Sequence, residues 1–292
     1  MSKKIMVPAT SANLGCGFDS LGIAVNRYLE IELVKPLDHW FLEHDLGADI
    51  PNDEQNLIIK TALSVVTDLK PYHLKMTSQI PLEHGLGSSS SAIVAGIKLA
   101  LLLSDVKLTI AEQLALACDM EGHPDNVVPA LLGGLQVASY DEEKNLDFVS
   151  LPQPECQMIA FVPDYSLSTK AARSVLPKAY KKSDAILASS KANVLIASLS
   201  TSDLVLAGKM MESDLFHEKY RASLIPELEA IRALGHEHHA FATYLSGAGS
   251  TIMTWISQNN SSSFIDALKE FQHSHNGDIL TLTVDPYGAR IV

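Results

Sequence analysis

The sequence has few cysteines, and they form no recognisable pattern. Cys16, Cys118 and Cys156 are odd in number, lie far apart and lack the spacing of metal ligands. Secreted domains stabilised by disulfides and zinc-binding modules carry denser, regularly spaced cysteines. The pattern is typical of free thiols and predicts a protein of the reducing cytoplasm.

Positive charge is also scarce. The chain has 22 Lys and Arg against 34 Asp and Glu, a formal net charge of -12. No run of basic residues is longer than the pair Lys181 and Lys182. Since a nucleic-acid surface needs a basic patch or stripe, we expect no nucleic-acid partner.

Long apolar runs are missing as well. The apolar stretch 93–103 is interrupted by Gly96 and Lys98 and is too short to span a bilayer. The apolar run before Pro8 is too short for the hydrophobic region of a signal peptide. The sequence therefore predicts a soluble protein with no membrane partner.

What the chain does contain is enough for about two domains. It has 292 residues, of which 47% are hydrophobic and 19% charged, as in ordinary globular proteins. Helical and strand patterns mix without strict alternation, which predicts an α+β fold. Pro152 and Pro154 precede a buried-looking strand, so we expect one domain over 1–152 and a second over 153–292.

Periodicity and end signals predict the individual elements. Thr109 is expected to cap a helix, and Pro124 to occupy a first helical turn. Helices are expected at 55–69, 89–103, 109–118, 124–132, 170–176, 184–200, 225–234 and 262–273. Strands are expected at 4–7, 28–34, 72–77, 135–139, 157–162, 241–245, 251–256 and 279–284.

The segment PLEHGLGSSSSA, residues 81–92, is the strongest functional signal. Glycine permits close backbone approach, serine supplies hydroxyls, and a following helix start favours an anion, so the segment predicts a phosphate site. No lysine follows Gly85 or Gly87 as in the P-loop, and Ser90 replaces the third glycine of a dinucleotide fingerprint. A flexible loop that caps the next helix is the alternative.

Four other segments are rich in polar residues or glycine: 8–22, 121–126, 166–173 and 245–251. Three of them also have a plain structural interpretation: a tight turn in the first, capping by Asp125 or Asn126 in the second, and a hairpin in the last. In the third, Thr169 and Arg173 would share one helix face. Arg173 and Arg221 could capture a carboxylate, although exposed surface arginines are commoner.

Three of these segments occur in the order of one superfamily's signature motifs. PATSANLGCGFDSLG, PLEHGLGSSSSA and LSGAGST resemble motifs one, two and three of the galactokinase, homoserine kinase, mevalonate kinase and phosphomevalonate kinase superfamily. SANLGxGFDSLG, EGHPDN, STKAARSVLP and EKYRASLIPEL resemble its homoserine kinase branch. The resemblance spans nearly the whole chain. It departs from the family at Cys16, where proline is usual, and at Ser91, where alanine is common.

The resemblance implies a two-domain kinase fold. The N-terminal domain would resemble the second domain of ribosomal protein S5 and bind ATP, and the C-terminal domain would be ferredoxin-like. The active site would lie between them. Around ATP it implies Asn56, near adenine, and the loop residues Pro81, Leu82, Glu83, His84, Gly85, Leu86, Gly87, Ser88, Ser89, Ser90 and Ser91.

The resemblance also implies the chemistry, which is Mg²⁺-dependent transfer of the ATP γ-phosphoryl group to the hydroxyl of L-homoserine in threonine biosynthesis. Ser89 and Glu121 would approach the metal, and with Asp19 they form the expected catalytic set. Asp19 is expected to bind the substrate's ammonium group, with base catalysis left open. The residues expected to hold homoserine are Asn13, Asp19, His123, Asn126, Thr169, Arg173 and Arg221.

Alternatives to this activity stay open at this point. The nearest is a kinase for mevalonate or phosphomevalonate, which are also carboxylates. A catalytically silent nucleotide and metabolite sensor of the same fold is another. The histidines of GHEHH, residues 235–239, could bind metal, but a solvated turn explains them better. The sequence does not determine the oligomeric state, for which a homodimer is one option.

Overall fold

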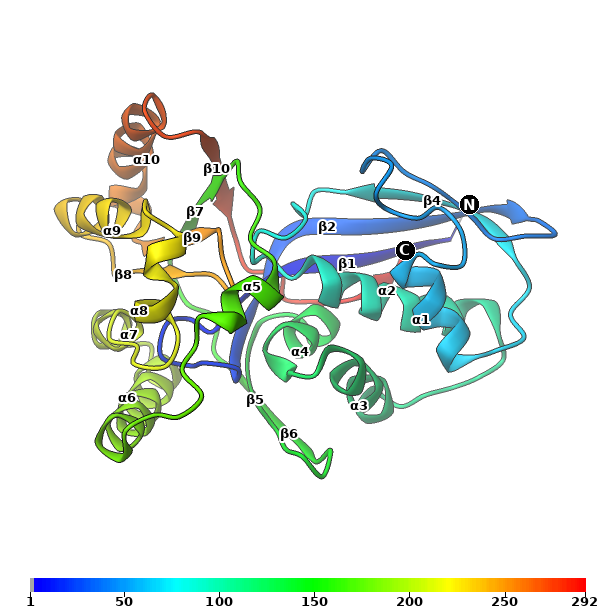
Figure 1. Cartoon of the computed structure of the whole chain (residues 1–292), viewed down its shortest axis with the longest axis horizontal. Helices are drawn as coiled ribbons and strands as arrows, with labels where there is room; N and C mark the ends of the chain where they lie inside the picture. The colour runs from blue at the N-terminus through cyan, green and yellow to red at the C-terminus, as the bar shows by residue number, and fades with distance from the viewer. Residues whose placement is uncertain (1–2) are drawn as a thin grey trace.

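The computed structural model describes residues 3–292, which form two β-sheets flanked by helices (Figure 1). The first sheet has the order β11-β1-β2-β4-β3, and β5 and β6 extend it from the start of β2. Only the β3–β4 pair is parallel. Its strands are β1 (Lys4–Ala12), β2 (Leu21–Pro36), β3 (Phe41–Glu43), β4 (Tyr72–Ser78), β5 (Leu135–Tyr140), β6 (Leu146–Leu151) and β11 (Arg290–Ile291).

Helices α1 to α4 cover one face of the first sheet (Figure 1). The longest, α2, buries Val94 and Ile97 and packs against α1 at Gly96, where a side chain would meet the Ile58 carbonyl. Their burial removes apolar surface from water, the dominant stabilising term. The helices are α1 (Leu57–Val65), α2 (Ser88–Leu103), α3 (Ile110–Glu121) and α4 (Pro124–Leu132).

The helix-end predictions in this region had mixed outcomes. Thr109 caps α3 in a capping box with Glu112, and Pro124 opens α4, so both predictions are confirmed. Capping of α4 by Asp125 or Asn126 is wrong. His123 is the N-cap residue and makes no side-chain cap bond, because the Asp125 and Asn126 side chains bond His123 and Thr10 instead.

The second sheet has the order β10-β7-β9-β8 and is wholly antiparallel. If the four strands are numbered by their order along the chain, their order across the sheet is 4-1-3-2. This is the β-α-β-β-α-β arrangement of a ferredoxin-like unit. Its strands are β7 (Gln157–Pro163), β8 (Ala242–Leu245), β9 (Ile252–Ile256) and β10 (Gly277–Leu282). Its helices are α5 (Thr169–Ser174), α6 (Lys182–Ser200), α7 (Leu204–Met211), α8 (Glu218–Arg221), α9 (Leu228–Glu237) and α10 (Gln258–Gln272).

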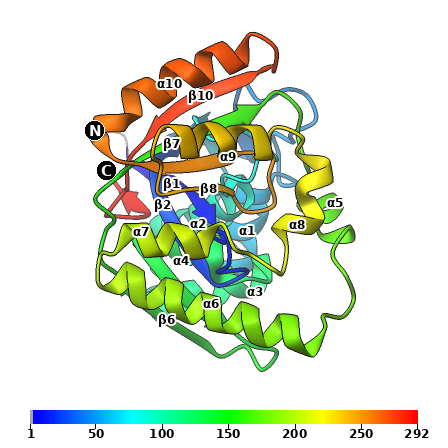
Figure 2. The ribbon, with the colours of Figure 1, turned by 90° about the vertical axis from the view of Figure 1, so that its left-hand side faces the viewer.

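Strand β7 is buried on both faces because each face meets a different layer. Met158 and Ala160 join the large core that continues into the first sheet, whereas Ile159 and Phe161 join a second core with α9 and α10. This two-residue alternation is the strand period. Figure 2 shows α9 and α10 on one side of these strands and α6 and α7 on the other.

The chain changes sheets between β6 and β7, close to the predicted boundary at residue 152. The division into 1–152 and 153–292 stays a prediction as a domain boundary, and the last strand crosses it. β11 returns to the first sheet and pairs with β1, Ile5 opposite Ile291. The α+β prediction is confirmed. Among residues 3–292, no helix has the length and apolar content needed to traverse a bilayer.

Candidate active site

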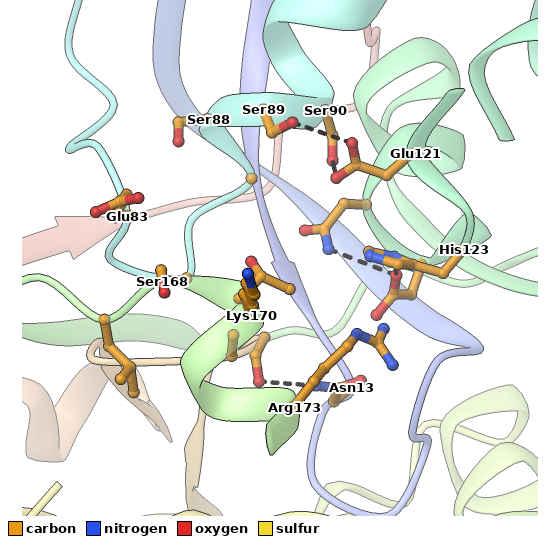
Figure 3. A pocket seen from close by; sticks show the side chains of 18 of the residues that line it. Asn13, Glu83, Ser88, Ser89, Ser90, Glu121, His123, Ser168, Lys170 and Arg173 are labelled. Atoms are coloured by element: carbon orange, nitrogen blue, oxygen red, sulfur yellow. Dashed lines mark hydrogen bonds and ion pairs between the residues drawn. The ribbon is translucent and has the colours of Figure 1, made fainter. Parts of the chain in front are cut away.

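Two neighbouring cavities share Glu83, Ser88 and Ser89, and the first is lined by residues from both halves of the chain. The first, of about 330 Å³, collects most of the predicted site residues (Figure 3). The predicted residues on its walls are Asn13, Asp19, Glu83, Gly85, Gly87, Ser88, Ser89, Ser90, Glu121, His123, Asn126, Thr169, Arg173 and Arg221. The second cavity, of about 380 Å³, is more apolar and contains Asn56 and Leu82.

The glycine-serine loop brings its backbone to the first cavity at the start of α2. Gly87 is the N-cap residue, with φ 72° and no side-chain cap bond. The N–H groups of the first helical turn are therefore not capped by that residue, and the helix dipole favours an anion there. Glycine is needed because a Cβ at Gly87 would lie 2.1 Å from the Thr10 hydroxyl, and one at Gly85 would lie 2.2 Å from the Ser246 carbonyl.

Glu121 ends α3 beside the first turn of α2. Its two carboxylate oxygens accept hydrogen bonds from Ser89, at 3.1 Å, and from Ser90, at 2.7 Å. Glu121 forms no ion pair within the described part of the chain. Hydroxyl and carboxylate oxygens are hard ligands, and Mg²⁺ commonly uses one or two carboxylates together with substrate phosphates. Ser89 and Glu121 therefore fit a magnesium site.

His123 and Asp125 form a largely buried pair that also lines the first cavity. His123 Nδ1 lies 2.5 Å from Asp125 Oδ1. Burial lowers the pKa of His123, but the hydrogen bond to Asp125 and the charges of Asp125, Glu121 and Asp19 together raise the pKa above its ordinary value. His123 is therefore more readily charged than a free histidine.

Asp19 and Arg173 meet across the cavity from opposite halves of the chain. Arg173 donates to both carboxylate oxygens of Asp19, at 3.1 and 2.8 Å. Asp19 has a left-handed backbone, with φ 54°, and its N–H donates to the Asn13 side chain at 3.0 Å. The geometry is the two-point arrangement by which arginine binds carboxylates.

Arg221 is buried, with 2% of its surface exposed. Its guanidinium donates to the carbonyls of Ala172 and Gly247 at 3.2 and 2.9 Å, and to His217 Nδ1 at 3.1 Å. His217 Nε2 then donates to the Gly15 carbonyl at 2.9 Å. Burial and the nearby Arg173 charge lower the pKa of Arg221 to about 10, so it stays charged at neutral pH.

Two asparagines predicted to bind substrate also hold the cavity together. Asn13 donates to the Gly247 carbonyl at 2.8 Å and so joins the first signature segment to the third. Asn126 accepts a 2.7 Å hydrogen bond from the Thr10 hydroxyl. Both are largely buried but reach the cavity wall. Their roles toward substrate stay predictions.

Four predicted loop residues line neither cavity. Leu86 is buried in the core, the Ser91 hydroxyl donates to the Pro8 carbonyl at 3.0 Å, and His84 Nδ1 lies 2.9 Å from Ser250 Oγ. Pro81 lines a separate cavity of about 260 Å³. These contacts anchor the loop to its surroundings. Only some side chains of a phosphate loop can point inward, because the rest must fix its path.

The sequence prediction missed six residues that line the first cavity. All lie in segments that had been singled out, but none of the six had been predicted as a site residue. Lys170, in SLSTKAAR, is the one of them that carries a positive charge. The six residues are Asp125, Leu167, Ser168, Lys170, Gly247 and Ala248.

A second set of potential metal ligands is already paired within the protein. Oxygen or nitrogen atoms of Asp19, His123 and Asp125 lie within 4.8 Å of one another. Asp19 pairs with Arg173, however, and Asp125 pairs with His123. We therefore assign no metal to this set. In GHEHH, His236 contacts Glu212 at 2.7 Å and His238 contacts Ser263 at 3.1 Å, as expected for polar surface residues.

Comparison with known proteins identifies the family. The models for the GHMP kinases N terminal domain and the GHMP kinases C terminal domain match residues 56–134 and 195–274. A homoserine kinase of Lactococcus lactis subsp. lactis (strain IL1403) is 52% identical and covers 99% of this chain and 98% of its own. A homoserine kinase of Streptococcus thermophilus (strain CNRZ 1066) is 51% identical, over 98% of each chain.

Solved structures agree with this assignment. A Listeria monocytogenes protein assigned as a homoserine kinase superposes with a TM-score of 0.88 at 40% identity, over 99% of each chain. A mevalonate kinase superposes with a TM-score of 0.72 at 17% identity, over 96% of this chain and 98% of its own, which supports the shared fold alone. The chain therefore belongs to the GHMP kinases, in the homoserine kinase family.

Proposed function

We propose that the protein transfers the γ-phosphoryl group of ATP to the side-chain hydroxyl of L-homoserine, giving O-phospho-L-homoserine for threonine biosynthesis. The observation that carries this proposal is the first cavity. It joins a helix start suited to phosphate, a carboxylate suited to Mg²⁺ and an ion pair suited to an amino acid. Full-length likeness to homoserine kinases supports the same activity.

The nucleotide would occupy both cavities. Adenine suits the second, where Asn56 lies among apolar side chains such as Leu29, Ile50 and Ile80. The phosphates would then pass Ser88 and Ser89, which border both cavities. The backbone amides at the start of α2 and the Glu121 carboxylate would lie beside the phosphates.

Magnesium would be held by Ser89 and Glu121, and when bound it would neutralise charge on the ATP phosphates. Ser90 donates to the second Glu121 oxygen and so fixes the plane of the carboxylate. The amides at the start of α2 would orient the phosphates and offset their charge. Phosphoryl transfer depends mainly on such positioning and charge stabilisation, so a strong base is not obligatory.

The amino-acid end of homoserine suits the pair Asp19 and Arg173. A zwitterion carries one charge of each sign, so its ammonium group can bind Asp19 while its carboxylate binds Arg173 and Arg221. Mevalonate and phosphomevalonate have a carboxylate but no ammonium group to satisfy Asp19. A substrate carboxylate that engages Arg173 competes with Asp19 for that guanidinium, and a partly buried carboxylate that loses its partner costs free energy. An ammonium group on the substrate replaces that partner, which favours the amino acid.

Comparing acceptors in one assay tests the proposal. ADP release from ATP and Mg²⁺ would be measured with L-homoserine, mevalonate, phosphomevalonate and galactose under identical conditions. We expect efficient turnover with homoserine alone. Turnover of another alcohol would replace homoserine as the substrate, and nucleotide binding without any turnover would favour a sensor. A cytoplasmic location and a homodimer are further expectations, which fractionation and light scattering would test.

A further inference from the structure

The first cavity contains one lysine, Lys170, that was not among the predicted site residues. It is the second residue of α5 and lies on the cavity wall. Figure 3 shows it between the labelled serines of the phosphate loop and the labelled Asn13 and Arg173. Within residues 3–292 its ammonium group makes no hydrogen bond or ion pair with another side chain.

The position of Lys170 is set by a direct link to the phosphate loop. The Leu167 N–H donates to the Glu83 carbonyl at 2.9 Å, so the segment leading into α5 runs against the loop. Ser168 then caps α5, because its hydroxyl oxygen accepts a 3.2 Å hydrogen bond from the Ala171 N–H. These two contacts hold the start of α5, and Lys170 with it, over the cavity.

The other cations of the cavity are already engaged. Arg173 pairs with Asp19, Arg221 donates to two carbonyls and His217, and the proposed function assigns both arginines to the substrate carboxylate. Four carboxylates also line the cavity, those of Asp19, Glu83, Glu121 and Asp125. With three Lys and Arg cations against four carboxylates, the walls do not neutralise a triphosphate by themselves. Lys170 is the cation left for the incoming phosphate.

We propose that the Lys170 ammonium group binds the γ-phosphate of ATP and stabilises it during transfer. It would supply from α5 the lysine that the glycine-serine loop lacks. This inference rests on the proposed function. In the transfer, the substrate hydroxyl oxygen bonds to the γ-phosphorus, the bond to the β–γ bridging oxygen breaks, and ADP leaves with that electron pair. The hydroxyl proton is released to solvent, and Lys170 exchanges no proton.

Nucleotide binding gives a test that does not depend on turnover. Lys170→Met removes the charge at similar length, Lys170→Arg retains it, and Lys182→Met removes an exposed lysine at the start of α6. Affinities for ADP and for the non-transferable ATP analogue AMP-PNP, both with Mg²⁺, would be measured by titration calorimetry. We expect Lys170→Met to weaken AMP-PNP binding about 10-fold, as for loss of a charged hydrogen bond, and to leave ADP binding unchanged.

Turnover provides the second readout. We expect Lys170→Met to lower kcat about 10- to 100-fold. Removal of one preorganised hydrogen-bond donor from an enzyme site typically lowers kcat by about 100-fold or more, so this expected loss does not exceed that effect. Lys170→Arg should retain most of the activity, and Lys182→Met all of it. Equal effects on ADP and AMP-PNP, or an unchanged kcat in Lys170→Met, would overturn the assignment.

This outcome can be separated from failure of the proposed function. If the unmodified protein did not phosphorylate homoserine, the acceptor assignment would fail first. The contrast between AMP-PNP and ADP would still report on Lys170, because it requires no acceptor. If homoserine were phosphorylated and that contrast were absent, only the role of Lys170 would be wrong.

Discussion

Asp19 and Arg173 form a two-point ion pair, with nitrogen–oxygen distances of 3.1 and 2.8 Å, although they lie 154 positions apart. Asp19 follows β1 in the first signature segment, and Arg173 belongs to α5, which follows the second sheet's first strand. The pair therefore links the segment after β1 to α5 at the cavity wall. Its position makes it both a structural link and the expected site of substrate recognition.

Removing Arg173 should mainly weaken homoserine binding. We expect Arg173→Ala to raise the KM for homoserine about 10- to 100-fold, the equivalent of losing charged hydrogen bonds of about 1.5–3 kcal/mol. The KM for ATP should change little. Steady-state kinetics with each substrate varied would measure both values, and Arg173→Lys, which keeps the charge but not the fork, should fall between. If Arg173→Ala raised the KM for ATP more than the KM for homoserine, Arg173 would bind ATP and the assignment to homoserine would be wrong.

Removing the Glu121 carboxylate charge should alter magnesium dependence. We expect Glu121→Gln to need at least about 10-fold more Mg²⁺ for half-maximal turnover, since a neutral amide is a poorer ligand for a hard cation. Magnesium titrations of kcat would measure this. Glu112→Gln weakens the α3 capping box but lies at the other end of that helix, so it serves as the matched control. Identical magnesium curves for Glu121→Gln and the unmodified protein would remove Glu121 from the metal site.

Alanine at Gly87 should destabilise the protein more than alanine at another left-handed glycine. Gly47 has φ 90° with open space around its Cβ position, whereas a Cβ at Gly87 would collide with Thr10. Gly47→Ala should cost about 1–2 kcal/mol through its backbone alone. Gly87→Ala should cost about 1–3 kcal/mol more from the collision. Urea unfolding would measure both; equal losses would mean that the loop relaxes freely around Thr10.

The pH dependence of His123 follows from its pairing with Asp125. Because the folded pKa is raised, the charged pair contributes its full stability below the ordinary histidine value of about 6.5. This contribution is lost as pH rises through the folded pKa. We expect Asp125→Asn to lower the His123 pKa, which an NMR titration of its ring would follow. Asp141→Asn, in an exposed turn, should leave the His123 titration unchanged; an unchanged titration in Asp125→Asn would refute the coupling.

Local sequence signals predicted most elements of the fold. Thr109 and Pro124 marked helix starts correctly, because caps and first-turn prolines depend on a few adjacent residues. The expected strand at 157–162 agrees with β7, which is apolar throughout. β6 was missed because its middle residues are exposed and lack a strong apolar pattern, and β11 because only Arg290 and Ile291 form it.

The site was predicted less completely than the fold. The three signature segments and both arginines were found, since their spacing is visible in the chain. The contact of Asn13 with Gly247, the pairing of Asp19 with Arg173 and the place of Lys170 could not be found in this way. These contacts depend on how distant segments pack, which no local pattern encodes.

The pairing of β1 with β11 has a consequence for biosynthesis. Translation produces β1 before the second sheet but its partner β11 only after it, so the first sheet cannot complete its edge until the second sheet has been synthesised. Until then β1 exposes unpaired backbone groups, a template for wrong pairing or aggregation. Removal of the residues from Arg290 onward should therefore lower the yield of native protein even though they lie outside the catalytic cavity.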